Sequence, residues 1–388
     1  MDANRFITHS LHDLRPARIL AAAIDAVEPG RLVKDYLQNR NLPKHGGLFL
    51  LGIGKAAESM TSAAAELCKD FTDALVITKH ASSPVRERFT VMESGHPIPD
   101  ERSLAAGQAA LSFVSSLNKS DLLVCLISGG GSALVTVPHE GISLAEMQSK
   151  TSALLASGAT INEINVLRRQ LDRIKGGGLA RATKAKIVSL ILSDVIGNSM
   201  ETIASGLTVD PALGMRVENI IIGDIRAAAQ AARKQAGAEG FDSEILDLGI
   251  QGETRKVGSR FAKRLMEARR NRKSPFCLIA GGETTVTIRG HGKGGRNQEL
   301  ALSTVDELSG TDNILFASLA TDGDDGPTNA AGAVVDGETR QRAEGLGMSA
   351  SDYLSRNDAY SFFGPLNDLI KCGYTGTNVN DLVFLIGL

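Results

Sequence analysis

Short runs of apolar residues alternate along the chain with longer stretches in which apolar positions recur every three or four residues. This alternation is typical of parallel sheets joined by crossover helices, so we predict an α/β fold. In the first part of the chain the predicted strands lie at 48–53, 74–78, 122–127 and 187–192. The predicted helices between and after them lie at 55–68, 101–117, 143–156 and 162–184, with two more in the first 60 residues packed on the same core.

The second half of the chain has a different pattern. A strand at 243–248 is followed by a basic helix at 253–272, and then by apolar runs that predict five more strands, at 275–281, 284–289, 314–320, 332–336 and 381–386. The basic helix carries Val257, Phe261 and Leu265 at spacings of four, which favours a surface helix with an inward apolar stripe over a nucleic-acid patch. We place the boundary at 245/246, giving an N-terminal domain (1–245) and a smaller α/β C-terminal domain (246–388).

Composition narrows the class of protein. The formal net charge is −2 over 388 residues, so no overall field attracts a polyanion and we expect no nucleic-acid partner. The four cysteines form no C-x-x-C pair, which suits a reducing compartment. We find no basic segment followed by an apolar leader and no apolar run long enough to cross a bilayer. These features predict a soluble cytoplasmic protein without a membrane partner.

Glycine is in excess, with 41 residues, and it gathers in loops that follow predicted strands. Gly52, Gly54 and Lys55 form the first such loop, which fits the dinucleotide fingerprint G-x-G-x-x-A. The next strand ends in Lys79 and His80 instead of the acid that NAD binding requires, and a Walker A loop is not matched. The loop still predicts an anion site at a helix N-terminus beside an ammonium group, with a plain tight turn as the alternative.

A second glycine loop follows the strand at 122–127 and comprises Ser128, Gly129, Gly130, Gly131 and Ser132. It lacks the G-x-S-x-G pattern of a hydrolase elbow, and three glycines let backbone N–H groups turn toward one ligand. Asp194 follows the strand at 187–192, at the end where open α/β sheets bind ligands. This residue is either a metal ligand or a turn-forming acid.

The densest polar loops lie in the second half. A glycine loop that enters a helix carries Glu283, Lys293, Arg296, Asn297 and Glu299. The loop at 321–331 supplies Asp322, Asp324 and Asp325, and its closely spaced acids suit Mg²⁺ but do not match an EF-hand. The loop before the last strand offers Thr375, Thr377, Asn378, Asn380 and Asp381. Since no histidine has a metal-ligand spacing and no cysteine is set up as a nucleophile, this inventory is typical of phosphoryl transfer.

At these residues the sequence resembles the class II glycerate kinases, also called glycerate 2-kinases, a two-domain family with a MOFRL C-terminal domain. The stretches that carry the resemblance include GIGKAA, SGGGSAL, GGRNQE, DGDDGPT and TGTNVNDL, in the family order from about residue 50 to the C-terminus. The resemblance implies a Rossmann-like N-terminal domain, a smaller α/β C-terminal domain and an active site in the cleft between them. It also implies transfer of the ATP γ-phosphate to the 2-hydroxyl of D-glycerate with Mg²⁺.

The resemblance implies roles for individual residues. Lys55 matches the essential lysine of the family and Arg296 its functionally important arginine, which would hold a carboxylate or the γ-phosphate in two bonds. Asp194, Asp322 and Asp325 are candidates for Mg²⁺ coordination, and one of them could accept the substrate proton. The residues at 128–132, with Gly52, Gly54, Glu283, Asn297, Thr377, Asn378 and Asn380, are candidates for substrate or nucleotide binding.

Four positions depart from the family pattern. Ile196, Asn198 and Leu207 stand where members commonly have Pro, Asp and Pro, and Tyr374 stands where a proline is common. The asparagine at 198 removes a carboxylate that could hold a metal or act as a base, so such a role falls to Asp194. Two other functions stay open: an NAD(P)H-dependent hydroxypyruvate reductase and a ligand-binding regulator without turnover. A homodimer is also left open.

Overall fold

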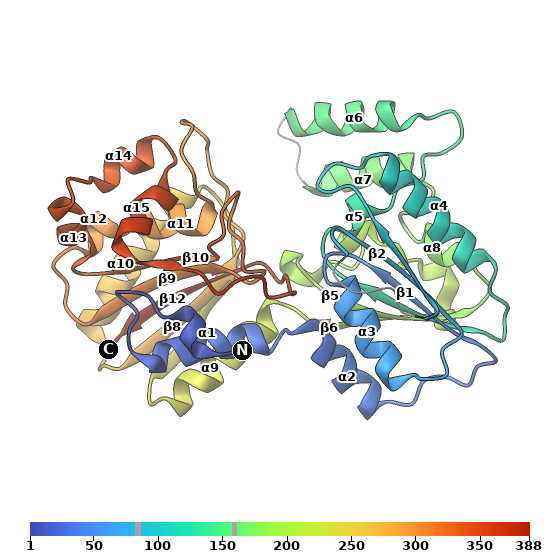
Figure 1. Cartoon of the computed structure of the whole chain (residues 1–388), viewed down its shortest axis with the longest axis horizontal. Coiled ribbons are helices and arrows are strands. Elements are labelled where there is room, and N and C mark those ends of the chain that lie inside the picture. Colours follow the sequence, from blue (N-terminus) through green and yellow to red (C-terminus); the bar gives the residue numbers. More distant parts are fainter. Residues whose placement is uncertain (82–86, 157–160) are drawn as a thin grey trace. The chain divides into compact units, whose positions relative to one another are not determined.

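The computed structural model describes residues 1–81, 87–156 and 161–388, which form two compact units (Figure 1). One is continuous and runs from Pro29 to Asp224; we call it the middle unit. The other combines Met1–Glu28 with Ile225–Leu388, and we call it the split unit. Within the described ranges, no helix combines the length and the apolar character needed to cross a membrane.

The middle unit is built on a six-stranded sheet in the order β3-β2-β1-β4-β5-β6, with every neighbouring pair parallel. Its strands are β1 (Leu48–Ile53), β2 (Asp73–Thr78), β3 (Phe89–Glu93), β4 (Leu122–Ile127), β5 (Lys186–Leu192) and β6 (Val217–Gly223). This order is that of the Rossmann fold, so the predicted fold class is confirmed. The strands β3 and β6 were not predicted, because they form the two edges of the sheet and their residues are mostly only half buried.

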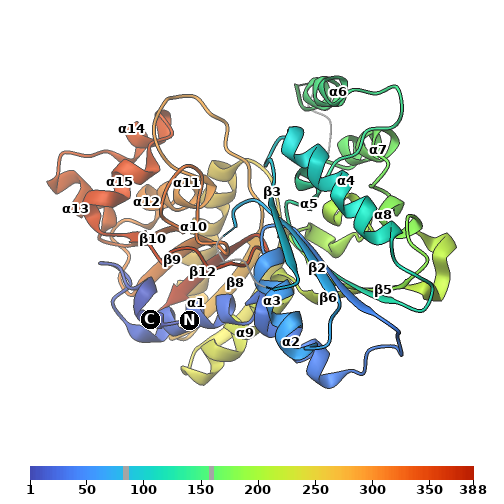
Figure 2. The same cartoon turned by 45° about the vertical axis from the view of Figure 1, so that its right-hand side comes forward.

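Helices cover both faces of this sheet. They are α2 (Pro29–Asn39), α3 (Ala57–Leu67), α4 (Glu101–Ser115), α5 (Gly131–Leu134), α6 (Leu144–Ala156), α7 (Ile161–Leu171) and α8 (Gly178–Arg181), and short 3-10 turns lie at Ile196–Asn198, Ile203–Ser205 and Pro211–Arg216. Figures 1 and 2 show α2 and α3 on one side of the sheet and α4 and α8 on the other. Residues of α4, α5 and α8 pack with the sheet residues Leu51, Cys125 and Ile187 in one core cluster.

The single helix predicted at 162–184 is wrong, because the chain leaves the helix at Leu171. The next residue, Asp172, is buried, and its carboxylate accepts hydrogen bonds from Thr136 Oγ1 at 2.6 Å and from the Val137 N–H at 2.9 Å. Lys175 is also buried, pairs with Asp172 and donates to the Val135 carbonyl. This buried ion pair holds the chain in a turn that the apolar periodicity does not reveal.

The split unit has a mixed sheet in the order β11-β10-β9-β12-β8-β7. Its strands are β7 (Asp242–Ile250), β8 (Phe276–Gly282), β9 (Ile314–Ala320), β10 (Gly332–Asp336), β11 (Leu369–Ile370) and β12 (Asp381–Gly387). Only β7 and β8 run parallel to each other, and the other neighbours are antiparallel. The strand predicted at 284–289 is wrong: Thr285 makes one isolated bridge to Glu253, and Ile288 is 80% exposed.

The helices of the split unit are η1 (Ala3–Phe6), α1 (Leu14–Asp25), α9 (Ile225–Ala238), α10 (Thr254–Asn271), α11 (Arg296–Leu302), α12 (Val305–Leu308), α13 (Thr339–Gly345), α14 (Ala350–Ser355) and α15 (Ala359–Leu366). In Figure 1, α1 and α9 lie on one side of the sheet and α10 to α15 on the other. The apolar stripe predicted on α10 is confirmed, since Val257, Phe261 and Leu265 are buried against Phe276 and Phe316.

The two units divide the chain differently from the boundary predicted at 245/246. The chain passes from one unit to the other after Glu28 and again after Asp224. The two N-terminal helices do exist, but α1 packs against α9 of the split unit and only α2 packs against α3 of the middle unit. An amphipathic helix shows in its sequence that it buries one face, but not which core receives that face.

Candidate active site

The first cluster of predicted site residues lies at the carboxyl edge of the middle-unit sheet. The register pairs Ile53 at the end of β1 with Ile127 of β4, and Ile127 with Ile191 of β5, so the three following loops begin side by side. The Lys55 N–H donates to the Gly129 carbonyl at 2.9 Å, which joins the two glycine loops. The strand order reverses between β1 and β4, and this switch point is where open α/β sheets bind ligands.

Three side chains lie against the second glycine loop. A Cβ on Gly129 would overlap the carboxylate of Asp194. Gly130 has a left-handed φ of +85°, and a Cβ there would lie 3.1 Å from the ring of His96 and 3.3 Å from Cγ of Lys55. The loop therefore needs glycine at both positions, one for close approach and one also for its backbone conformation. The structure thus brings the predicted residues Lys55, Gly129, Gly130 and Asp194 together.

The two serines of this loop make internal contacts. Ser128 is buried, and its hydroxyl accepts a hydrogen bond from the Ala56 N–H at 3.0 Å, at the start of α3. Ser132 shares a hydrogen bond of 2.7 Å with Ser205, which lies in a left-handed conformation with φ of +56°. Next to it, Ala204 has φ of +48° and lies against Gly131. A left-handed conformation is costly for residues other than glycine, and such strain gathers at functional sites.

The glycines of the first loop have different surroundings. Gly52 is buried inside β1, and a Cβ there would overlap the hydroxyl of Thr61 on α3, so Gly52 lets α3 approach the sheet. Gly54 has φ of +136° and lies directly against Ser128. Of these two predicted binding residues, only Gly54 lies beside the second glycine loop.

His96 was missed by the sequence analysis, which found only that the histidines lack a metal-ligand spacing. It follows β3, whose Glu93 pairs with Thr78 at the end of β2. Burial and the neighbouring ammonium groups of Lys55 and Lys79 lower the pKa of His96 to about 4. The ring is therefore neutral near pH 7. The signal that could have revealed it is position alone: a polar residue after a strand that ends at this edge of the sheet.

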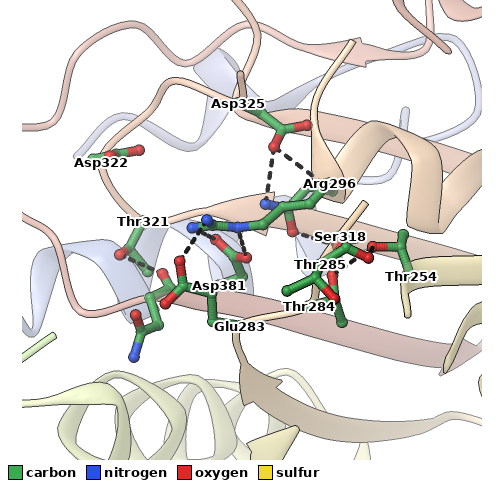
Figure 3. Close-up of polar contacts among 12 residues, drawn as sticks. Thr254, Glu283, Thr284, Thr285, Arg296, Ser318, Thr321, Asp322, Asp325 and Asp381 are labelled. Atoms are coloured by element: carbon green, nitrogen blue, oxygen red, sulfur yellow. Dashed lines mark hydrogen bonds and ion pairs between the residues drawn. The ribbon is translucent and has the colours of Figure 1, made fainter. Parts of the chain in front are cut away.

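The second cluster lies on the split unit and centres on Arg296, the first residue of α11 (Figure 3). Its guanidinium donates to Asp381 from Nε at 2.5 Å and from Nη2 at 3.1 Å, and to Glu283 from Nη1 at 2.6 Å. The strand register brings Asp381 and Glu283 close to each other, because Asp381 is the first residue of β12 and pairs with Gly282, the last residue of β8, which Glu283 follows. Asp381 is buried and Glu283 is half exposed.

Asp325 lies at the start of the same helix. Its carboxylate accepts hydrogen bonds from the N–H groups of Asn297 at 3.1 Å and Gln298 at 2.8 Å, so Asp325 caps α11. Burial raises the pKa of Asp325 to about 7. The negative charge of Asp381 also raises this pKa, whereas the hydrogen bonds from the two N–H groups lower it. The observed contacts of Asp325 are those of a helix cap, and its role in metal binding stays a prediction.

The remaining predicted residues of this unit surround the cluster. Asn297 is buried, and its amide oxygen accepts a hydrogen bond from Ser318 at 2.6 Å. The Asn378 side chain accepts the Asn380 N–H at 3.2 Å, and the Asn380 carbonyl accepts the Thr321 hydroxyl at 2.6 Å. Thr377 is buried, and among the described residues its hydroxyl has no hydrogen-bond partner.

The predicted metal ligands do not form one group within a unit. Asp194 belongs to the middle unit, whereas Asp322 and Asp325 belong to the split unit. Across the residues that the structure describes, no three or more His, Cys, Asp or Glu side chains gather into a group that could hold a metal by themselves. Mg²⁺ usually needs only one or two carboxylates when phosphate oxygens and waters complete its shell. The placement of an active site between the domains also stays a prediction.

One departure from the family pattern has a structural explanation. Asn198, in a left-handed conformation, donates from its side-chain amide to the carboxylate of Asp224 at 2.6 Å. An aspartate at 198 would bring a second negative charge to this carboxylate. Leu207 is buried and Tyr374 is 64% exposed, and nothing in the structure ties these two residues or Ile196 to a change in chemistry.

Comparisons with known proteins agree with this arrangement. Residues 16–232 match a family described as a domain of unknown function (DUF4147), and residues 276–381 match the MOFRL family. A D-glycerate 2-kinase from Thermotoga maritima is 40% identical over 408 residues, covering 95% of this chain and 96% of the relative. The crystal structure of a glycerate kinase from Thermotoga maritima, 38% identical, superimposes with a TM-score of 0.88 over 96% of this chain and 98% of that chain.

A further relative carries a different name. A protein from Agrobacterium vitis with the provisional name hydroxypyruvate reductase is 36% identical over 384 residues, covering 88% of this chain and all of the relative. The matches to the kinases extend over nearly the whole chain. The two matched family models, at 16–232 and 276–381, span the loops of the first cluster and Arg296 with Asp381 of the second. The chain therefore belongs to the glycerate 2-kinase family with a MOFRL C-terminal domain, as its motifs predicted.

Proposed function

We propose that the chain transfers the γ-phosphoryl group of ATP to the 2-hydroxyl of D-glycerate, giving 2-phosphoglycerate. The observation that carries this proposal is the glycine loop at 129–131, at the switch point of a parallel sheet, with the side chain of Lys55 against Gly130. A loop of this kind with a neighbouring ammonium group suits a phosphate. The 40% identity to a protein named D-glycerate 2-kinase supports the choice of acceptor.

The residues of the middle unit would handle phosphate charge. Lys55 neutralises the negative charge that the transferring group carries, which is most of what a protein contributes to phosphoryl transfer. The Gly129–Gly131 loop offers backbone N–H groups to the same group. Asp194 lies against Gly129, so it either accepts the hydroxyl proton or binds the metal.

Arg296 would bind an anionic group of a substrate. In the structure its bidentate partner is Asp381, so that edge of the guanidinium is already used. The contact from Nη1 to Glu283 is different, because the Glu283 side chain is 48% exposed. We propose that a carboxylate or phosphate replaces Glu283 at Nη1 while Asp381 keeps the guanidinium in place.

The donor set fits Mg²⁺ delivered with ATP. Asp194 offers one carboxylate beside the glycine loop of the middle unit. One or two carboxylates are sufficient when phosphate oxygens supply other ligands. When bound, the ion would reduce the negative charge of the phosphates.

The test is an assay of the purified chain with MgATP and D-glycerate, with ADP release measured by a coupled enzyme and the product identified by ³¹P NMR. We expect ADP release that requires D-glycerate and stops when EDTA removes the metal, and a product signal of 2-phosphoglycerate. L-Glycerate serves as the matched acceptor. If 3-phosphoglycerate were the only product, the proposed position of transfer would be wrong.

A second candidate function, reduction of hydroxypyruvate with NAD(P)H, is favoured only by the name of the Agrobacterium relative. Against it, β2 ends in Thr78 and is followed by Lys79 and His80, without the acid that binds the ribose of NAD. Oxidation of NADH or NADPH by hydroxypyruvate, followed at 340 nm with the same preparation, separates the two functions.

A further inference from the structure

Two lysines on the split unit lie against the ring of one tyrosine. The ammonium nitrogen of Lys293 lies 4.4 Å from the centroid of the Tyr360 ring, and that of Lys371 lies 5.8 Å from it. Both lysines are exposed, whereas Tyr360 is half-buried. Because like charges repel, this arrangement concentrates positive charge at one place on the surface instead of spreading it.

The sheet topology brings these residues to the edge that carries Arg296. The register places the ends of β8, β9 and β11 at one edge of the split-unit sheet. Lys371 directly follows β11, and Lys293 lies in the loop after β8, three residues before Arg296. Tyr360 is the second residue of α15. The two lysines therefore belong to the same edge as the second cluster, although neither takes part in its hydrogen bonds.

The loop that carries Lys293 is held against the start of α15. The Lys293 N–H donates to the Asp358 carboxylate at 3.0 Å, and the Lys293 carbonyl accepts the Tyr360 N–H at 2.9 Å. A Cβ on Gly292 would lie 2.4 Å from Cβ of Asp358, so the close approach of loop and helix requires glycine there. The side chain of Lys293 therefore starts from a fixed point beside the ring.

The ring of Tyr360 is also held at its polar end. Its hydroxyl donates to the side-chain oxygen of Asn329 at 2.7 Å, in the loop that contains Asp325. A ring fixed in this way attracts ammonium groups to its face and restricts two long side chains that would otherwise move freely in water. Less conformational entropy is then lost when a ligand binds them.

The two ammonium groups have no carboxylate partner within residues 1–81, 87–156 and 161–388. The neighbouring carboxylate of Asp358 pairs with Arg356 at 3.2 Å and accepts the Ser361 hydroxyl at 2.7 Å. Each ammonium group has three N–H donors, and the face of a tyrosine ring offers them no acceptor oxygen. A phosphate group, with three strong acceptor oxygens and a charge of about −2, matches two such donors.

We propose that Lys293 and Lys371, ordered by Tyr360, form a phosphate subsite on the split unit. The subsite takes a phosphate group of either the nucleotide or the phosphorylated hydroxy acid, because both present the same oxyanion. The inference rests on the proposed function for the identity of these two ligands, and it adds a site to those assigned to Lys55 and Arg296. Binding of phosphate itself does not depend on turnover.

The first experiment uses Tyr360 as the reporter, since the chain has four tyrosines and no tryptophan. The ring Cε–H signals are followed by ¹H–¹³C NMR after labelling of tyrosine, and the Tyr360 signal is identified from its loss in Tyr360→Phe. Inorganic phosphate, ADP and 2-phosphoglycerate are titrated separately at constant ionic strength. We expect phosphate to move the Tyr360 signal, because a bound anion shifts the ammonium groups over the ring. The Tyr36 ring, which carries Arg40 in the middle unit, is the internal control.

The two organic ligands identify the source of the phosphate. Whichever of ADP and 2-phosphoglycerate gives half of the maximal Tyr360 shift at the lower concentration supplies the phosphate group. A Tyr360 signal that none of the three ligands moves overturns the subsite.

Lysine variants show whether the shift depends on these two ammonium groups. We expect Lys293→Met and Lys371→Met each to raise the phosphate concentration at half-maximal shift about tenfold, the usual effect of losing one charge-assisted hydrogen bond. Methionine keeps an unbranched side chain against the ring and removes only the charge. The control is Lys273→Met, which changes an exposed lysine just before the amino end of β8, at the opposite edge of the sheet. Equal half-maximal concentrations in Lys371→Met and Lys273→Met would overturn the subsite.

Steady-state kinetics separate this inference from the proposed function. If ADP is the tighter ligand, Lys371→Met should raise the KM for ATP about tenfold and keep kcat within about twofold of native, because it removes binding that substrate and transition state share. If 2-phosphoglycerate is the tighter ligand, the variant should weaken product inhibition about tenfold instead.

The two proposals then fail in different ways. An active native enzyme whose KM for ATP and product inhibition are the same in Lys371→Met would refute the subsite and leave the proposed function intact. A chain without kinase activity whose Tyr360 signal still responds to phosphate would refute the proposed function and leave the subsite standing.

Discussion

The guanidinium of Arg296 donates two hydrogen bonds to the carboxylate of Asp381, from Nε at 2.5 Å and from Nη2 at 3.1 Å. Asp381 is the more deeply buried partner, and burial raises the pKa of its carboxyl even though Arg296 acts to lower it. Breaking a buried pair by removing one partner leaves a charge without compensation, which costs more than the pair contributes. The structural role of Arg296 and the substrate-binding role that we propose for it are therefore coupled, and an experiment must separate them.

We expect Arg296→Met to lower the free energy of unfolding by about 3 kcal/mol, because the Asp381 carboxylate is left buried without its cation. Adding Asp381→Asn should restore most of that stability but not the activity, which should stay at least about 100-fold below native. Urea unfolding and the kinase assay measure the two effects. The control is Arg264→Met, which breaks an exposed pair with Glu267 and should cost below about 1 kcal/mol. Recovery of activity in the double variant would exclude a direct role for Arg296.

For Lys55 we expect a substitution to reduce activity strongly and to change stability little. Lys55→Ala should lower kcat by about 10² to 10³, because in the proposed mechanism it removes the ammonium group that neutralises the transferring phosphoryl group. Its side chain is only half buried, so the unfolding midpoint should stay within about 2 °C of native. Lys69→Ala is the matched control for loss of a lysine from the same unit. A kcat near the native value in Lys55→Ala would show that the proposed role is wrong.

The sequence was sufficient to predict those strands of the middle unit that are buried on both faces of the sheet. The runs at 48–53 and 122–127 became the central strands β1 and β4, because a strand inside a parallel sheet has to be apolar throughout. The edge strands β3 and β6 lack that signature and were missed. Conversely, the alternating residues at 284–289 resemble a strand, but sequence does not show whether a neighbour is available to pair with them.

For the candidate site, the sequence predicted which loops carry polar residues, but not which residues of those loops contact one another. Glycine loops after strands pointed to Lys55 and the loop at 129–131, because the ends of parallel strands share one edge. They did not reveal His96 or Ser205, whose positions depend on the path of long connections. Asp381 was noted in its loop, but its pairing with Arg296 depends on an antiparallel register across β8 and β12. Sequence can locate polar loops, but the partners come from the sheet topology.

Asn198 allows a test of one departure from the family pattern. Asn198→Asp would replace the amide that donates to Asp224 at 2.6 Å with a second carboxylate. We expect the free energy of unfolding to fall by about 1 kcal/mol or more at pH 7, and less at pH 4, where one of the two carboxyls can hold a proton. The control is Asn313→Asp, an exposed asparagine in the same left-handed conformation. Equal losses in both variants would mean that the contact with Asp224 contributes nothing.

The low pKa of His96 predicts how stability depends on pH. The folded chain releases the His96 proton at about pH 4, whereas the ordinary value is 6.5, so between these values the unfolded chain binds more protons. The contribution of His96 to stability is therefore present above pH 6.5 and is lost as the pH falls toward 4. We expect the difference in free energy of unfolding between native and His96→Gln to be more favourable to native at pH 7.5 than at pH 5.

The cause of the shift can be tested in the same series. Burial is the largest cause, and the ammonium groups of Lys55 and Lys79 add to it. Lys79→Met removes one of these charges, so the pH dependence measured against Lys79→Met/His96→Gln should weaken without disappearing. A pH dependence that Lys79→Met leaves unaltered would mean that the charge of Lys79 does not contribute to the low pKa of His96.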